Sequence, residues 1–127
     1  MGGVLVRFLV ISIVAAALLA VAAGASAAPA KDNYQLKGEV YPNGLYKIEM
    51  ETKAGKKLRV VPAGTYRIKI EDKATIHNFR LSGPGVNKAT SIAGKTETIW
   101  TVRLRKGTYR FLCDPHAASM RGSFRVT

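Results

Sequence analysis

The segment FLCDPHAASM, residues 111–120, concentrates the side chains of this chain that could bind a metal ion. It contains Cys113, the only cysteine, together with His116, one of two histidines, and Met120, one of three methionines. The other histidine, His77, lies well upstream. Two imidazoles and a thiolate form a trigonal ligand set that suits copper, and a thioether is the usual weak axial ligand. We therefore predict a mononuclear copper site made by His77, Cys113, His116 and Met120.

The spacing of these residues favours electron transfer as the chemistry of the site. Cys113 ends a predicted strand, Pro115 then forces a turn, and His116 and Met120 lie on the loop that follows. His77 would approach from a separate predicted strand. Ligands divided between a sheet and a tight loop hold similar positions for Cu(I) and Cu(II), as fast electron transfer requires. No histidine remains for the second metal centre of a copper enzyme, so we do not expect an enzyme.

The same residues are compatible with two other functions. A copper carrier without a redox partner would use an identical ligand set. A cysteine enzyme would use Cys113 as nucleophile and His116 as base, but no oxyanion motif is evident, and an accessible thiol is short-lived in an oxidising compartment. Each residue taken alone is more often structural, since buried cysteines and methionines commonly fill cores. Their combination is what favours copper.

The amino-terminal residues predict export. Residues 1–7 carry one basic and no acidic residue, 8–23 are almost entirely apolar, and Ala25-Ser26-Ala27 fits the small-residue pattern at a signal cleavage site. We predict a secretory signal peptide over 1–27, a short flexible linker over 28–33 and one domain over 34–127, in a periplasmic or extracellular protein. An uncleaved membrane anchor is the alternative, because the apolar run is only slightly short of a full span.

The charge of the chain predicts anionic partners. It has 20 basic and 8 acidic residues, a net charge of +12, and loss of the signal would remove only Arg7 and leave +11. We expect the protein to be a monomer whose partner is a redox protein with an acidic surface. Contact with an anionic membrane surface is the alternative. Nucleic acid is not expected, because the basic residues are scattered and the chain is predicted to be exported. The charge could also serve solubility alone.

Short alternating runs separated by turn signals such as Pro42-Asn43-Gly44 cover the chain after residue 33. No helical periodicity of 3.6 residues is evident there, so we predict an all-β domain, a Greek-key sandwich or barrel of about seven to eight strands. Met50 and Trp100 are expected in or near its core. Asp114 is expected to be a surface charge, with acceptance of a backbone N–H of the loop as the alternative. The predicted strands are 34–40, 45–50, 58–61, 66–70, 76–81, 98–104, 109–113 and 123–126.

The ligand motifs resemble those of the small type 1 (blue) copper proteins, the cupredoxins of the plastocyanin, azurin and pseudoazurin kind. The matching segments are His77-Asn78-Phe79 and residues 109–116, followed by Met120 and Gly122, and the resemblance extends over roughly residues 34–127. It implies an eight-stranded Greek-key β-barrel that binds one copper ion. The interval H-x3-M is one residue shorter than in plastocyanins and one longer than in amicyanin-type proteins, so the resemblance leaves the copper–Met120 distance open.

The resemblance also implies roles for residues that do not bind the metal. Asn78, beside the first histidine, would brace the ligand loop and the cysteine sulfur by hydrogen bonds. Pro115 would help to hold the loop. The imidazole edge of His116, next to the apolar Ala117 and Ala118, would be the exit for electrons.

Overall fold

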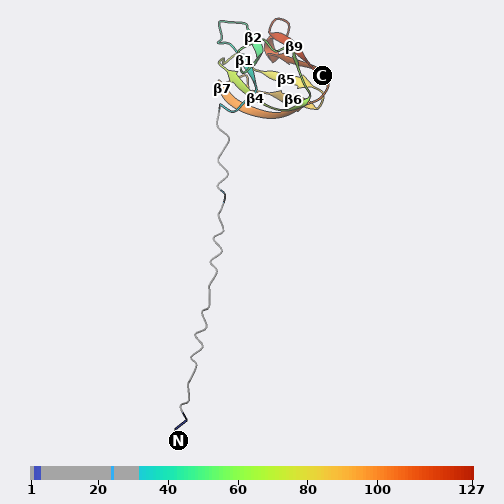
Figure 1. The fold of residues 1–127 in the computed structure, drawn as a ribbon. Coiled ribbons are helices and arrows are strands. Elements are labelled where there is room, and N and C mark those ends of the chain that lie inside the picture. Colours follow the sequence, from blue (N-terminus) through green and yellow to red (C-terminus); the bar gives the residue numbers. More distant parts are fainter. Residues whose placement is uncertain (1, 4–23, 25–31) are drawn as a thin grey trace.

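The computed structural model describes residues 2–3, 24 and 32–127 (Figure 1). Almost all of the predicted signal peptide, 1–27, and residues 28–31 of the predicted linker lie outside the described residues. The described part of the chain contains no helix long and apolar enough to span a bilayer. Residues 36–126 form nine strands in two sheets, and the all-β prediction is confirmed.

The first sheet has four strands and is mixed. In spatial order the strands are β2 (Ile48–Thr52), β1 (Leu36–Val40), β4 (Gly64–Asp72) and β7 (Thr96–Leu104). Strand β1 pairs in parallel with β4 and antiparallel with β2, and β4 pairs antiparallel with β7 over nine residues of each strand. A parallel pair cannot be joined by a tight hairpin, so β1 and β4 are connected through β2 and the short β3 (Val60–Val61).

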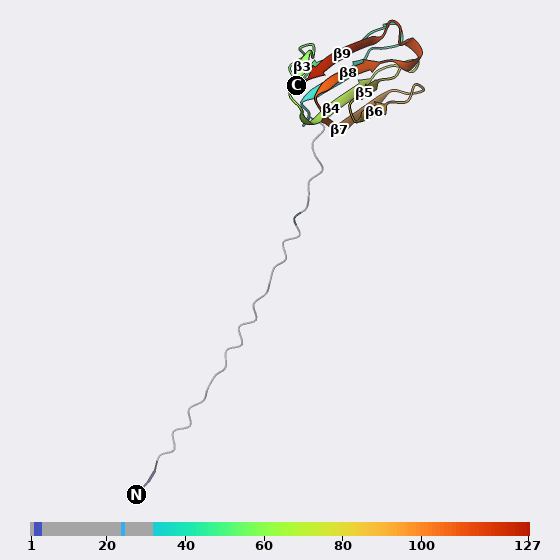
Figure 2. The same ribbon diagram turned by 90° about the vertical axis from the view of Figure 1, so that its right-hand side faces the viewer.

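The second sheet has five strands and supplies most of the ligand region. In spatial order they are β3 (Val60–Val61), β9 (Arg121–Val126), β8 (Gly107–Leu112), β5 (Arg80–Gly83) and β6 (Val86–Ala89). Figure 2 shows β9, β8, β5 and β6 side by side in this sheet. Neighbouring strands are antiparallel except at the edge, where the two-residue β3 runs parallel to β9.

Aromatic rings fill the space between the sheets beside the ligand region. Phe79 is fully buried, stacks on Phe111 with ring centroids 6.0 Å apart, and meets Trp100 edge-on at 6.2 Å. Gly38 on β1 allows this approach, because a Cβ at that position would lie 2.6 Å from the Phe79 ring. Gly122 does the same for Phe111, whose ring a Cβ would meet at 2.3 Å. The residues next to the ligands are therefore fixed by close packing.

The predicted strand over 76–81 is displaced in the structure, and β6 was not predicted. The strand β5 begins only at Arg80, because the backbone N–H groups of Asn78 and Phe79 donate to side chains instead of to a neighbouring strand. His77 therefore lies in an irregular segment before β5 and not on a strand. The edge strand β6 has largely exposed residues, so it shows no apolar alternation in the sequence.

Ion pairs cover the outer face of the first sheet. The carboxylate of Glu39 accepts a hydrogen bond of 2.8 Å from Lys37 and another from Lys73, and the Glu39 side chain is almost fully covered. Burial by itself would raise the pKa of this carboxyl, but the two lysines outweigh it and hold the pKa below its ordinary value of 4.5. Glu39 therefore favours its charged form in the folded protein.

Replacing Glu39 with glutamine is expected to weaken the acid sensitivity of the fold. A carboxyl with a depressed folded-state pKa stabilises the protein above its unfolded pKa, and this contribution is lost as the pH falls through the folded pKa. The free energy of unfolding should therefore fall below about pH 4.5 and fall less steeply in Glu39→Gln. Urea unfolding of both proteins at several pH values measures the two slopes. Equal slopes would contradict the assignment.

Candidate metal centre

Three predicted ligands converge in the folded protein. The Nδ1 atoms of His77 and His116 are 3.0 Å apart, and the Cys113 sulfur lies 3.7 Å from the first and 3.6 Å from the second. One donor atom of each residue thus lies within 4.8 Å of the other two. A hydrogen bond between the imidazoles alone would leave the position of the sulfur unexplained, whereas a metal ion uses all three donors.

The size of this triangle fits a bound metal ion. Metal–nitrogen bonds of about 2.0–2.1 Å and a metal–sulfur bond of about 2.3 Å, at angles between tetrahedral and trigonal, separate nitrogen from sulfur by about 3.6–3.8 Å. The separations in the structure are 3.6 and 3.7 Å. The two nitrogens, 3.0 Å apart, are a few tenths of an ångström closer than the same angles give, about 3.3–3.6 Å. A slight parting of the imidazoles would admit the ion.

The ligand loop is closed by its own backbone hydrogen bonds. Cys113 follows β8, and a short 3-10 helix over Asp114–His116 begins with Pro115 near its first position. The N–H of His116 donates to the carbonyl of Cys113 at 3.1 Å, and the N–H of Met120 donates to the carbonyl of His116 at 2.8 Å. The N–H of Cys113 in turn donates to the carbonyl of Met120 at 3.0 Å. The loop is therefore held shut between β8 and β9.

The donors differ in their exposure. His77 and Cys113 are completely buried, Met120 is 1% exposed, and His116 is partly exposed. His77 directs Nδ1 at the other donors, while its buried Nε2 has no hydrogen-bond partner among the described residues. Burial raises the pKa of the Cys113 thiol, and a bound cation would favour the thiolate instead. Among the four predicted ligands, only His116 reaches the surface.

Asn78 connects the segment that carries His77 to the ligand loop. Its backbone N–H donates to the Cys113 sulfur at 3.4 Å. Its side-chain Oδ1 accepts the backbone N–H of Asp114 at 2.8 Å, and its Nδ2 donates to the Asp114 carboxylate at 2.7 Å and to the carbonyl of Thr90 at 3.3 Å. These contacts match those that the sequence resemblance implies. The supporting role of Asn78 stays a prediction.

Asp114 is more than the surface charge that the sequence predicts. Its carboxylate accepts two hydrogen bonds from the guanidinium of Arg80, 2.7 Å from Nε and 2.9 Å from Nη2, in addition to the one from Asn78. The hydrogen bonds from Arg80 lower the pKa of the Asp114 carboxyl. Arg80 therefore ties β5 to the ligand loop. Sequence reasoning did not identify Arg80, because no spacing rule relates it to Asp114.

Tyr46, which precedes β2, is a second residue that the sequence does not reveal. Its ring meets the His77 ring edge-on at 5.2 Å and the His116 ring at 5.0 Å, and the residue is 58% exposed. The alternating pattern that predicts a strand over 45–50 assigns Tyr46 no role at the metal centre. In the structure it covers the two imidazoles from the side of the first sheet.

Removing the Tyr46 ring is expected to open the metal centre to solvent. Tyr46→Ala should release copper to an excess chelator a few-fold faster than the wild type, because the ring covers both imidazoles. Stopped-flow transfer of Cu(I) to a coloured chelator measures the rate. Tyr34→Ala is the control, since the Tyr34 ring packs beside Lys53 and Lys69 and not beside the histidines. Equal release from all three proteins would exclude a covering role.

The arrangement of the two sheets and of the three donor atoms identifies the fold of the chain and the kind of metal site that it fits. The chain has the cupredoxin fold, and its His77, Cys113 and His116 cluster fits a type 1 copper site. Among solved structures it is similar to reduced rusticyanin (TM-score 0.53, 20% identity, covering 72% of this chain and 77% of that one). It is also similar to a rusticyanin described as a copper protein (0.52, 19%, 72% and 76%) and to rusticyanin from Thiobacillus ferrooxidans (0.51, 20%, 72% and 75%).

These likenesses establish the fold of the chain. No family description and no curated protein sequence matches it. The predicted resemblance to cupredoxins is therefore confirmed through the structure. The roles of His77, Cys113, His116 and Met120 as ligands stay predictions that the geometry fits.

Proposed function

We propose that this protein is a mononuclear type 1 copper protein that carries single electrons between redox partners. The observation that carries the proposal is the triangle of two imidazole nitrogens and one cysteine sulfur with sides of 3.0, 3.6 and 3.7 Å. Copper bound there supplies a Cu(I)/Cu(II) couple. The reduced rusticyanin to which the chain is similar supports the proposal.

The residues around the metal centre would hold the ligands in position and exclude water from them. Burial of His77 and Cys113 keeps solvent from two donors, and the Asn78 and Arg80 contacts hold the ligand loop against β5. A site held in this way changes little between oxidation states, which keeps the reorganisation energy of electron transfer low. The buried Met120 is proposed as the axial ligand.

The test is an absorption and EPR titration of the metal-free protein with Cu(II). We expect one equivalent to produce an intense visible band from thiolate-to-copper charge transfer, followed by reversible one-electron cycling with fast self-exchange. A colourless protein that binds copper weakly would overturn the proposal. Copper binding with rapid transfer of Cu(I) to a chelator and slow self-exchange would instead identify a copper carrier.

We also propose that the protein is exported to the periplasm or the cell exterior and that it is not an enzyme. The order of a basic start, an apolar run and Ala25-Ser26-Ala27 supports export. Mass spectrometry of the protein recovered from its native compartment tests this, since cleavage after Ala27 would leave a chain beginning at Ala28. A chain that retains Met1 in the membrane fraction would identify an uncleaved anchor.

A further inference from the structure

The two sheets differ sharply in charge. The strands of the first sheet contain six of the eight acidic residues of the chain, and seven of the eight ion pairs of the described part involve them. The strands of the second sheet contain no acidic residue. Their basic residues are Arg80, Lys88, Arg110, Arg121 and Arg125.

Three of these arginines share the outer face of β8 and β9. Alternation along the strands buries Tyr109, Phe111 and Phe124 and leaves Arg110, Arg121 and Arg125 exposed. The register pairs Leu112 with Arg121, Arg110 with Ser123, and Thr108 with Arg125, so cationic and small or apolar side chains alternate across the two strands. We call this surface, with Arg110, Arg121 and Arg125 as its cations, the arginine face.

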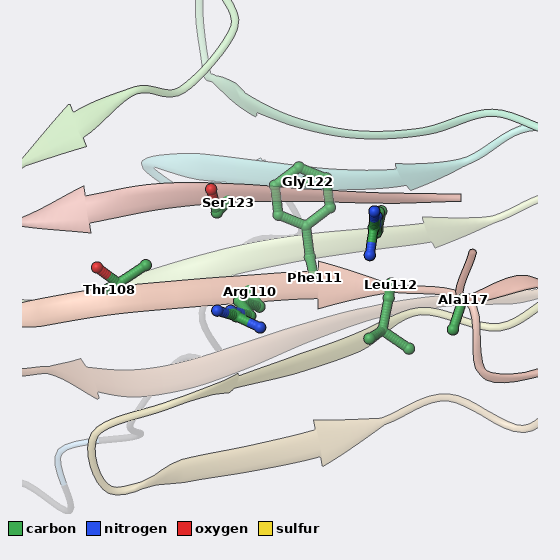
Figure 3. Close-up of a pocket in the computed structure, with 8 residues that line it drawn as sticks. Thr108, Arg110, Phe111, Leu112, Ala117, Gly122 and Ser123 are labelled. Atoms are coloured by element: carbon green, nitrogen blue, oxygen red, sulfur yellow. The ribbon is translucent and has the colours of Figure 1, made fainter. Parts of the chain in front are cut away.

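The arginine face is hollowed and lies beside the metal centre. A surface groove of about 540 Å³ runs along β8 and β9 and is lined by Arg110, Leu112, Arg121, Ser123 and Ala117, among others. Figure 3 shows Arg110 and Leu112 on β8, with Ala117 of the ligand loop at the end of the groove. Leu112 is also the covalent neighbour of Cys113. A partner in the groove would thus be one residue from a predicted ligand.

The cations of this face have no partner within the described part of the chain. Arg110, Arg121 and Arg125 make no side-chain hydrogen bond and no ion pair there, whereas Arg80 is held by Asp114. Guanidinium groups bind carboxylates in pairs of hydrogen bonds, and unpaired ones on one face create a positive potential that attracts acidic surfaces. The lysines of the first sheet are largely neutralised by their own glutamates.

We propose that the arginine face is the docking surface for an acidic protein partner, placed to exchange electrons through the adjacent ligand loop. The exchange of electrons rests on the proposed function, whereas the docking surface does not. Ser123 and Thr108 between the arginines offer hydroxyl donors to the same carboxylates. Phe111 lines the groove but is only 4% exposed, and the other aromatic residues of β8 and β9 are buried. No aromatic ring is therefore presented for base stacking or for insertion into a bilayer.

The test compares two double variants with equal changes of charge. Arg110→Glu/Arg121→Glu reverses two cations of the arginine face, and Lys56→Glu/Lys57→Glu reverses two exposed cations in the turn after β2. The probe is a poly-L-glutamate peptide, titrated into isotope-labelled metal-free protein at low salt. We expect chemical-shift changes concentrated on β8 and β9, and an affinity at least about tenfold weaker in the arginine variant but nearly unchanged in the lysine variant.

Copper-loaded protein supplies a second readout. One electron passes from Cu(I) protein to hexacyanoferrate(III), and at low ionic strength the rate should fall several-fold more in the arginine variant than in the lysine variant. If the protein never develops the visible band, the proposed function fails while the peptide titration still decides the docking surface. Both variants should unfold at wild-type urea concentrations, since all four side chains are exposed.

Two results would overturn the inference. Equal weakening of peptide binding in both double variants would show that net charge alone governs the association. Tighter binding of phosphatidylserine vesicles or duplex DNA than of poly-L-glutamate, lost in the arginine variant, would assign the face to a membrane or to nucleic acid. Competition experiments at matched ionic strength separate these cases, because all three interactions depend on salt.

Discussion

Copper-loaded Cys113→Ser is expected to lose the intense visible absorption of the wild type, by at least about an order of magnitude. The band requires a thiolate bound to Cu(II), and Cys113 is the only thiol of the chain. Its sulfur lies 3.6 and 3.7 Å from the two Nδ1 atoms and is fully buried, so no other sulfur can take its place without rebuilding the loop. A serine hydroxyl is a harder ligand and stays protonated near neutral pH.

The two buried methionines provide a control for the axial position. Met120 and Met50 are each 1% exposed, but only Met120 lies on the ligand loop. Met120→Leu should shift the redox potential and the EPR hyperfine splitting while the visible band persists, whereas Met50→Leu should leave both unchanged. An intense band in Cys113→Ser would refute the ligand assignment, and identical spectra and potentials in the two methionine variants would refute the axial role.

Asn78→Ala is expected to cost about 2–4 kcal/mol of folding stability in the metal-free protein. Asn78 is 2% exposed, and its side chain satisfies the backbone N–H of Asp114, the carbonyl of Thr90 and a carboxylate oxygen of Asp114. Alanine would leave the backbone N–H of Asp114 and the carbonyl of Thr90 without this partner, whereas the Asp114 carboxylate would keep its hydrogen bonds from Arg80. Urea unfolding followed by circular dichroism measures the loss.

Asn87 is the matched control for this substitution. It lies on the exposed edge strand β6, where its Oδ1 accepts one hydrogen bond of 2.8 Å from Arg80. Asn87→Ala should cost less than about 0.5 kcal/mol, because water can replace an exposed partner. Similar losses in both variants, or a loss below about 1 kcal/mol in Asn78→Ala, would show that the network around Asp114 does not hold the ligand loop.

The strands that the sequence predicts well are those whose signal is local. Alternation in 66–70 and 98–104 reports a buried face within each strand, and β4 and β7 contain both segments. The strand predicted over 76–81 is displaced because the apolar residues of this segment suggest a strand that the backbone does not form. The backbone N–H groups of Asn78 and Phe79 donate hydrogen bonds to side chains from distant positions instead. Such bonds have no signature in a window of neighbouring residues.

Residue type and spacing are enough to predict the ligand set of the centre, because the chain has only one cysteine and two histidines. The surroundings of these side chains follow from the tertiary structure alone. Tyr46 over the imidazoles and Arg80 on the ligand loop come from positions with no fixed spacing to the ligands. The separation of the acidic residues of the first sheet from the arginine face of the second likewise depends on which strands share a sheet. Pairing between distant strands sets these neighbours, and short-range patterns do not encode it.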